Sequence, residues 1–537
     1  MSQIAVRPLH LSLRAALCVA TALTVAGAAH AQEGGTLRVA TFEPLCLDLN
    51  EGSSRNSQTA VQDIYDRLVS KNVDGTIHPW IASDWSISED GKTYAFTIRD
   101  GVIFHDDTPL DAEAVRVNLQ RWVDDKNAGG VPVESVTAEG NVVTVTLSSA
   151  YSPLLHDLSE PQLGLVSPAS IEAHSKEARC EGGPGVTVGS GPFEVAARTI
   201  GQSLTLVKNP DYNWAPADAA HEGPAYLDGV ELRFLAEDAV RVGAVESGQA
   251  DIATVIPAIA VAAIEANPNL QLLRTEQPGI PWSFWLNQND GPLEDVRVRE
   301  ALRLGVDYAG LVTAVFLGTA TPAYGAITPG IPAYYLPELE GRWSFDKDRA
   351  IALLEEAGWT EVGADGIRIR DGERLSLHDV TAVNWNNQQR ELFTQGIQAG
   401  LAEIGVEYIR EVLDFATVDT RYRANDYDLV DTSQSAGDPN LLFGAFHSAQ
   451  TWEAGNTNWG FVNDPALDAA LEEGLTTTDP DARVAAYRTA QEIITDNVYL
   501  LPIANPQVLV AAAKNVEGII FHNSGQIGSF HGVSLTE

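Results

Sequence analysis

Strand-like and helix-like segments alternate along this chain, and the alternation constrains the fold more than any other feature of the sequence. A β-rich run at 374–383 is followed by a helical apolar pattern at 386–405, which ends at Gly405, a residue suited to a helix C-cap. A second strand is predicted at 406–413 and a third at 427–434. This order predicts crossover connections and a parallel or mixed sheet, so we expect an α/β protein.

A second unit of the same kind is predicted earlier, with strands at 227–236 and 251–257 on either side of a helix at 237–250. The chain has 537 residues, well beyond the roughly 250 to 300 at which one hydrophobic core stops growing. Two separate units in a chain of this length favour two lobes with sheets of their own.

The N-terminus has the layout of a secretory signal peptide. Arg7 and Arg14 precede or flank an apolar run at 15–26, and small residues follow up to an expected cleavage site after Ala31. The apolar run is too short for a membrane-spanning helix, and the residues before Cys18 do not form a lipoprotein motif. We expect an exported protein of 506 residues that diffuses in the periplasm without a lipid anchor.

The charge balance argues against two classes of partner. The formal net charge is −39, and it becomes about −41 when Arg7 and Arg14 are removed with the leader. A chain this acidic repels the phosphates of nucleic acids and anionic lipids. We therefore expect no nucleic-acid partner and no binding to membrane surfaces.

Two cysteines remain after export, Cys46 and Cys180. An oxidising compartment favours their pairing, and the alternative is two buried free thiols. Two cysteines so far apart form no recognisable metal motif.

Motifs of catalysis and of cofactor binding are missing. The Gly-flanked Ser190 in VGSGPFEV lacks the Gly-x-Ser-x-Gly elbow, and the chain has no phosphate-cradling loop with its lysine and no His-Glu-x-x-His. Residues 105–107, His-Asp-Asp, place three side chains of metal-binding types next to one another. Because the side chains of consecutive residues diverge, we interpret this cluster as a turn before a helix capped by Asp111, and a metal site as the minor alternative. We expect no enzyme activity, no metal and no cofactor.

Open α/β sheets bind ligands outside the carboxyl ends of their strands. Here that rule indicates Trp385 after the first strand of the later unit, and the segment 433–440 after the third. Trp282 and Trp285 lie close together just before a polar turn, and tryptophan suits either a ligand clamp or a core.

Several motifs resemble solute-binding family 5, the extracytoplasmic receptors of ABC importers that include dipeptide-, oligopeptide- and nickel-binding proteins. The segment ASDWSISEDGKTYAFTIRDGVIFHDDTPLDAEAV resembles the family's signature region. Further resemblances follow in the family order: VGSGPFEV, KNPDYNW, EDVRVREALRLGVDYAGLV, FDKDRAIALLEEAGW and RVAAYRTAQEIITDNVYLLPI. Together they cover nearly the whole exported chain.

The resemblance implies a Venus flytrap of the two-lobed periplasmic binding proteins (type II, similar to cluster C), with an extra subdomain inserted in the first lobe. Transferred to this sequence, the first lobe is expected at 32–62, 190–287 and 506–537. The inserted subdomain is expected at 63–189 and the second lobe at 288–505.

The same resemblance bears on the ligand. Peptide-binding members hold the peptide's amino group with an Asp three residues before an acidic-Pro pair, and Ser435 stands at that position before Asp438-Pro439. The charge-assisted partner of an α-amine is therefore absent there. We list as predicted ligand contacts Trp282, Trp285, Trp385, Ser435, Asp438, Asn440, Ser53 and Arg55.

We expect a monomeric receptor that captures a small solute, a peptide or a peptide-like molecule, between two lobes. It would deliver the solute to the membrane permease of an ABC importer whose ATPase is a separate chain. Nickel chelates, opines and sugar-derived solutes remain alternatives for the ligand. The alternatives for the function are a secreted hydrolase with paired carboxylates and a receptor that docks to a protein partner.

Overall fold

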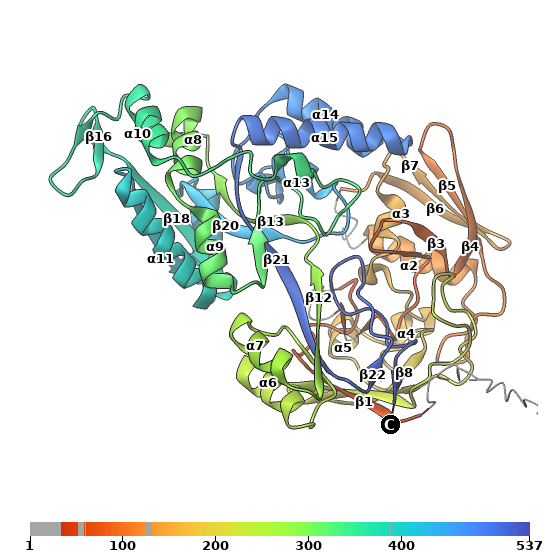
Figure 1. Ribbon diagram of the computed structural model, residues 1–537. Helices are drawn as coiled ribbons and strands as arrows, with labels where there is room; N and C mark the ends of the chain where they lie inside the picture. The colour runs from red at the N-terminus through yellow and green to blue at the C-terminus, as the bar shows by residue number, and fades with distance from the viewer. Residues whose placement is uncertain (1–33, 52–57, 60, 125–129, 387, 537) are drawn as a thin grey trace, which may run out of the picture.

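The computed structural model describes residues 34–51, 58–59, 61–124, 130–386 and 388–536. Figure 1 shows two bodies joined by long strands, with a further subdomain packed beside them. The expected signal peptide, Ser53 and Arg55 lie outside the described residues. Within the described ranges, no helix has the length and apolar character needed to cross a bilayer.

The first lobe is the body built on β1 and β8 to β12. The parallel neighbours of β1 are β10 and β11, and β9 and β8 extend the sheet antiparallel. The predicted unit is confirmed as β10, α6 and β11. The elements are β1 (Thr36–Thr41), β8 (Phe193–Thr199), β9 (Ser203–Lys208), β10 (Gly229–Phe234), α6 (Asp238–Glu246), β11 (Ile252–Thr254), α7 (Ala258–Ala266) and β12 (Leu270–Glu276).

The second lobe is the body built on β13, β14 and β18 to β20. The predicted unit is confirmed: β18 pairs parallel with β19 and β20, and α11 crosses between β18 and β19. Gly405 ends the crossover with a φ of 84°, which a residue without a side chain adopts at little cost. The strands are β13 (Ile280–Leu286), β14 (Ala320–Pro322), β18 (Ser376–Ala382), β19 (Glu407–Leu413) and β20 (Leu429–Gln434).

Helices cover this second sheet on its outer faces (Figure 1). They are α8 (Val296–Gly305), α9 (Tyr308–Phe316), α10 (Lys347–Glu356), α11 (Gln388–Glu403), α12 (Phe415–Arg423), α13 (Leu441–Phe446), α14 (Pro465–Thr476) and α15 (Pro480–Asp496). A small antiparallel sheet projects from the lobe, with β15 (Glu361–Val362), β16 (Arg368–Arg370) and β17 (Glu373–Arg374).

One strand connects the two lobes. The strand β21 (Leu500–Ala513) begins beside β13 and β14 and ends beside β11 and β12, so the strands of both lobes belong to one hydrogen-bonded path. The segment 276–280, between β12 and β13, makes the second crossing. We call these two segments the crossings. Domains close around a ligand when a few loop or element-terminal residues absorb the change in φ and ψ, and the crossing at 276–280 consists of such residues.

The insertion is the subdomain built on the four-stranded sheet β4-β5-β7-β6 and the helix α2. Its elements are β2 (Val69–Lys71), β3 (Ile77–Pro79), β4 (Ala82–Ile87), β5 (Thr93–Ile98), α2 (Ala112–Asp124), β6 (Val133–Glu139), β7 (Val142–Leu147) and α3 (Leu154–Asp157). The 3-10 helices are Pro161–Leu163, Pro292–Glu294, Pro337–Leu339, Val383–Trp385 and Trp452–Ala454, and the remaining elements are α4 (Pro168–Ala173), α5 (Lys176–Glu181), β22 (Val516–Glu517) and β23 (Ser534–Leu535). The residue boundaries expected for the lobes and the insertion stay a prediction.

Two local predictions are confirmed. Cys46 and Cys180 form a disulfide, which fixes α5 to the chain that follows β1. Asp111 accepts a hydrogen bond from the backbone N–H of Ala114 at 3.0 Å, as expected of a helix cap. His105 is directed away from its acidic neighbours, since its Nε2 contacts the carbonyl oxygen of Gly191 at 3.0 Å.

Candidate functional site

A cavity of about 520 Å³ lies between the two lobes. Its walls come from the carboxyl ends of β10 and β11 in the first lobe, and from α9, the start of α11 and β20 in the second. Residues of both crossings close it at one end, among them Gln277 and Pro506. This is the position at which the sheets of an α/β protein bind ligands.

The second-lobe wall contains a cation on an aromatic ring. The guanidinium carbon of Arg390 lies 5.3 Å from the centre of the Trp282 ring, within the range of a cation–π interaction. The indole N–H of Trp282 donates to the carboxylate of Asp431, and the same carboxylate lies 3.6 Å from Arg390. Trp282 also packs edge-on against Phe393, at 4.8 Å between ring centres. Contacts with Trp282 and Asp431 thus fix the position of the Arg390 side chain.

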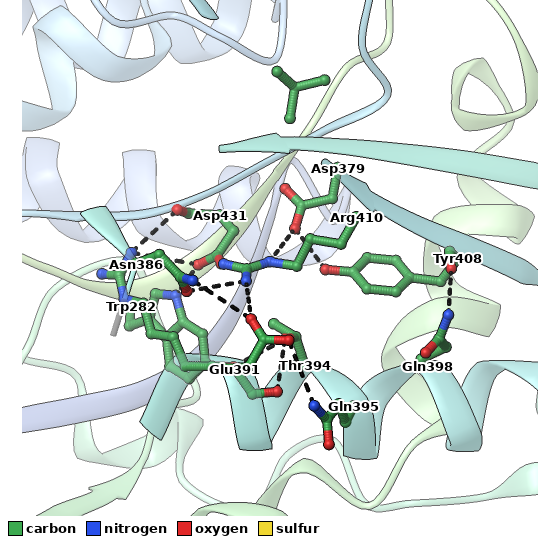
Figure 2. A network of polar contacts seen from close by, with 12 residues as sticks. Trp282, Asp379, Asn386, Glu391, Thr394, Gln395, Gln398, Tyr408, Arg410 and Asp431 are labelled. Carbon is green, nitrogen blue, oxygen red and sulfur yellow. Dashed lines mark hydrogen bonds and ion pairs between the residues drawn. The ribbon is translucent and has the colours of Figure 1, made fainter. Parts of the chain in front are cut away.

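Behind this wall lies a polar network, shown in Figure 2. Arg410 donates to Asp431 at 2.6 Å and to Asp379 at 3.1 Å, and Tyr408 donates to Asp379 at 2.5 Å. Burial raises the pKa of Asp379 to about 7, and the nearby charge of Asp431 acts in the same direction. The network holds β18, β19 and β20 in register beneath the cavity.

The first-lobe wall is organised by Arg241, which has no exposed surface. Its guanidinium donates to the carbonyl oxygens of Leu235 and Ala236 after β10 and of Thr254 and Val255 at the end of β11, at 2.8 to 3.2 Å. The cation also lies 4.0 Å from the centre of the Phe42 ring, just after β1. One buried arginine therefore sets the positions of three strand ends that face the cavity.

The end of β20 contacts the crossing and the insertion. The hydroxyl of Ser435 donates to the carbonyl oxygen of Pro278 at 2.9 Å. Asp438 is buried and accepts two hydrogen bonds from Arg483, at 2.7 and 3.1 Å, and Lys71 of the insertion lies 3.7 Å away. Arg483 and Lys71 hold the pKa of Asp438 well below its usual range against the effect of burial.

The predicted ligand contacts therefore occupy different environments. Trp282 lines the cavity. Trp285 lies in the core of the second lobe, 1% exposed and stacked on Phe446 at 5.3 Å, where packing accounts for it. Trp385 meets Phe415 edge-on at 5.8 Å, as expected where neighbouring strands end. Asn440 lies 3.5 Å from the hydroxyl of Tyr151 in the insertion. A direct contact with solute stays a prediction for each of them.

Sequence reasoning missed Arg241 and Arg390, which shape the two walls. Both lie in amphipathic helical patterns, where an arginine ordinarily faces solvent. A signal was available for Arg390, since it lies in the first turn of the helix α11, shortly after the carboxyl end of β18. Among the residues that the structure describes, no group of three or more His, Cys, Asp or Glu side chains could hold a metal ion.

Comparisons with known proteins agree with this geometry. The model of the bacterial extracellular solute-binding proteins, family 5 Middle, matches residues 76–453, more than half of the chain. The glutathione-binding protein GsiB of Escherichia coli O1:K1 / APEC is 27% identical over 536 residues, covering 95% of this chain and 96% of the relative. GsiB of Shigella flexneri is 26% identical with the same coverage.

Solved structures show the same fold. NikA from Brucella suis in complex with Fe(III)-EDTA matches with a TM-score of 0.79 at 21% identity, covering 93% of this chain and 100% of that one. The oligopeptide-binding protein AppA from Bacillus subtilis, in complex with a nonapeptide, matches with a TM-score of 0.75 at 21% identity, covering 95% and 100%. The two-lobed binding-protein fold is confirmed. With the family match over residues 76–453, the chain belongs to the bacterial extracellular solute-binding proteins of family 5, which serve ABC importers.

Proposed function

We propose that the protein captures a small peptide-like solute in the cavity between its lobes and delivers it, unchanged, to the permease of an ABC importer. The observation that carries the proposal is the position of the cavity. Its opposite walls belong to different lobes, and those lobes are joined through the two crossings.

A ligand in this cavity acts on the balance between open and closed forms. A solute that touches both walls binds the closed form better than the open form, so it shifts the population toward closure. A permease can then distinguish loaded from empty receptors by their shape. The ATPase that drives import is expected on a separate chain.

The class of solute is inferred from the relatives and from the site. GsiB is a glutathione-binding protein and AppA an oligopeptide-binding protein by name, so a short peptide or peptide derivative is the first class to test. Ser435 has no carboxylate with which to bind the amino group of a peptide. The carboxylate of Asp438 is already paired with Arg483. We therefore propose a peptide-like solute whose recognition does not depend on that pair.

The proposal also covers where the receptor acts and its oligomeric state. We propose that the mature receptor acts in the periplasm as a monomer, and the leader pattern at 1–31 and the family support this localisation. The relatives named above are binding proteins, so they give the hydrolase alternative no support.

Native mass spectrometry of the mature protein, purified gently from cells grown in rich medium, tests the proposal. We expect a stoichiometric small molecule that is released unmodified on denaturation, and a rise in Tm on adding it back. Ser433→Phe should abolish the rise because Ser433 lines the cavity, whereas Ser135→Phe, on an exposed site of the insertion, should preserve it. A protein that stays empty and gains no stability from glutathione or a panel of short peptides would contradict the proposal.

A further inference from the structure

A second cavity, of about 260 Å³, lies on the second lobe. Its walls come from the end of α8, the start of α9, the strands β14 and β21, and the segment 341–345 before α10. The described residues that line it are all different from those that line the interlobe cavity. We call it the α8–α9 cavity. Sites for drug-sized molecules begin at roughly 300 Å³, so this cavity suits a smaller molecule.

The α8–α9 cavity contains a buried cation, Arg303. This residue lies in the last turn of α8 and is 7% exposed. Its Nη1 donates to the carbonyl oxygen of Thr495 at 2.9 Å. Its Nε and Nη2 are buried and have no hydrogen-bond partner among the described residues. Elsewhere in this protein the same edge of an arginine holds a carboxylate, since Nε and Nη2 of Arg38 donate to the two oxygens of Asp251 at 3.0 and 2.6 Å.

A buried cation without an anion is costly. The desolvation of a charged group is offset only when its donors are satisfied and an opposite charge lies close. Among the described residues, no acidic side chain forms an ion pair with Arg303. Burial lowers the pKa of Arg303 to about 9, although the charges of Glu300 and Asp496 act in the opposite direction. The guanidinium is still charged at neutral pH, so the site favours an anion from outside the chain.

Aromatic side chains form much of the remaining wall. Trp343 lies against the guanidinium of Arg303, with 3.1 Å between the guanidinium carbon and the ring centre. Tyr308, Tyr324 and Phe345 also line the cavity. Phe345 is 51% exposed, so part of its ring is available to cover a ligand. A wall of rings beside one charged group suits a molecule with a flat apolar body and a single polar end.

One acidic residue restricts the ligand further. Asp307 lines the same cavity, is exposed, and accepts a hydrogen bond from the backbone N–H of Gly310 at 2.9 Å at the start of α9. Its charge opposes an anion whose negative charge is spread over the whole molecule. A ligand whose charge is confined to the end beside Arg303 avoids this repulsion, and a monocarboxylate on an apolar body is such a ligand.

We propose that the α8–α9 cavity is a second binding site, which takes a small carboxylate with a flat apolar body. The Nε and Nη2 of Arg303 bind the carboxylate, and the aromatic side chains around them enclose the body. The site lies outside the interlobe cavity, so the proposal does not rest on the proposed function. Because Pro502 and Ile503 of β21 line the site, a bound molecule contacts one of the two crossings.

The first measurement compares three ligands on the mature protein, in a buffer free of other carboxylates and of phosphate. They are benzoate, benzamide and acetate, and titration calorimetry gives the Kd of each. Benzamide keeps the ring without the charge, and acetate keeps the charge without the ring. We expect benzoate to bind at least about 10-fold more tightly than either, because each of the others lacks one half of the recognition.

Variants then locate the site. Arg303→Met should abolish the preference for benzoate over benzamide and change the Tm of the empty protein little, since it removes an unpaired buried charge. Phe345→Ser should weaken benzoate and leave acetate within about twofold. Ser433→Phe, which fills the interlobe cavity, should leave benzoate binding unchanged. Arg349→Met on α10 is the matched control, because Arg349 is exposed and lies outside the cavity wall.

The possible results separate clearly. Equal affinity for benzoate and benzamide in the unmodified protein would overturn the role of Arg303 without any variant. Equal affinity for benzoate and acetate would overturn the apolar requirement. Benzoate binding that survives Arg303→Met would overturn the site, and its loss in Ser433→Phe would place the ligand in the interlobe cavity instead.

Two further outcomes are also decisive. A protein that binds no benzoate at millimolar concentration would contradict the proposal. If Arg303→Met does not fold, the comparison of benzoate with benzamide and the exposed-site variant Phe345→Ser decide the question, and unchanged benzoate affinity in Phe345→Ser would then count against the α8–α9 cavity.

Discussion

Replacing Arg483 by methionine should destabilise the protein strongly, whatever its effect on solute binding. Arg483 is 12% exposed and lies on α15, where it donates twice to the buried carboxylate of Asp438 and once to the hydroxyl of Tyr334 at 3.1 Å. Methionine has similar length but no donors. The variant leaves Asp438 charged and desolvated, and a buried charge without its partner is the main cost.

The magnitude follows from what remains around the carboxylate. Breaking a buried ion pair by removing one partner ordinarily costs about 3 to 5 kcal/mol. Lys71 lies 3.7 Å from Asp438 and stays in place, so part of the charge remains compensated. We therefore expect a loss near the lower end, about 3 kcal/mol. Replacing Asp438 by asparagine in addition should recover part of it, since the unpaired charge is then gone.

Urea unfolding of the mature protein, followed by circular dichroism, measures the change. Arg488→Met is the matched control, because Arg488 is on the same helix and pairs with Glu338 at an exposed site, where a salt bridge contributes at most about 1 kcal/mol. If Arg483→Met costs no more than Arg488→Met, the buried pair does not stabilise this fold. Lower solute affinity with unchanged stability would instead place Asp438 among the ligand contacts, as the sequence suggested.

Three further predictions concern stability. Burial raises the pKa of Asp379 to about 7, so its stabilising contribution is present in acid and is lost as the pH rises through 7; from pH 6.5 to 8 the free energy of unfolding should fall by about 1 kcal/mol on its account, and Asp379→Asn should remove that share. The Cys46–Cys180 bond closes a loop with a sequence separation of 134. Replacing both cysteines by serine should therefore lower the free energy of unfolding by up to about 5 kcal/mol. An unchanged free energy of unfolding would indicate that the unfolded chain is compact without the bond. Arg241→Met should destabilise by about 3 kcal/mol or more and raise hydrogen exchange at 235–238, and unchanged exchange there would contradict its role in the first-lobe wall.

The fold was accessible from the sequence because its determinants are local. The periodicity at 374–413 gives β18, α11 and β19 within a few residues, and the φ of Gly405 explains why a glycine ends the crossover. Asp111 was identified as a cap from its place before an apolar pattern, and its hydrogen bond is present. The disulfide was predicted only from the oxidising compartment and from the even number of cysteines expected after export.

The site was only partly accessible. Trp282 and Trp285 are three residues apart and were indistinguishable by type, yet one lines the cavity and the other lies in the core. Residues three apart point to opposite faces of a strand, and β13 is buried on both faces, so the pattern does not tell which of the two tryptophans borders the cavity. That depends on which elements pack against each face.

The sequence by itself determined the class of fold and the family, and it indicated strand ends that border the cavity, because periodicity, capping and motif order are written along the chain. Only the tertiary structure decided which charges are committed and which face the cavity. Asp438 is paired with Arg483 from 45 positions away, while Arg241 fixes strand ends on the opposite lobe from Arg390. Burial and ion pairing depend on residues that are brought together from distant positions in the sequence. They set both the pKa of an ionisable group and whether it is available to a ligand.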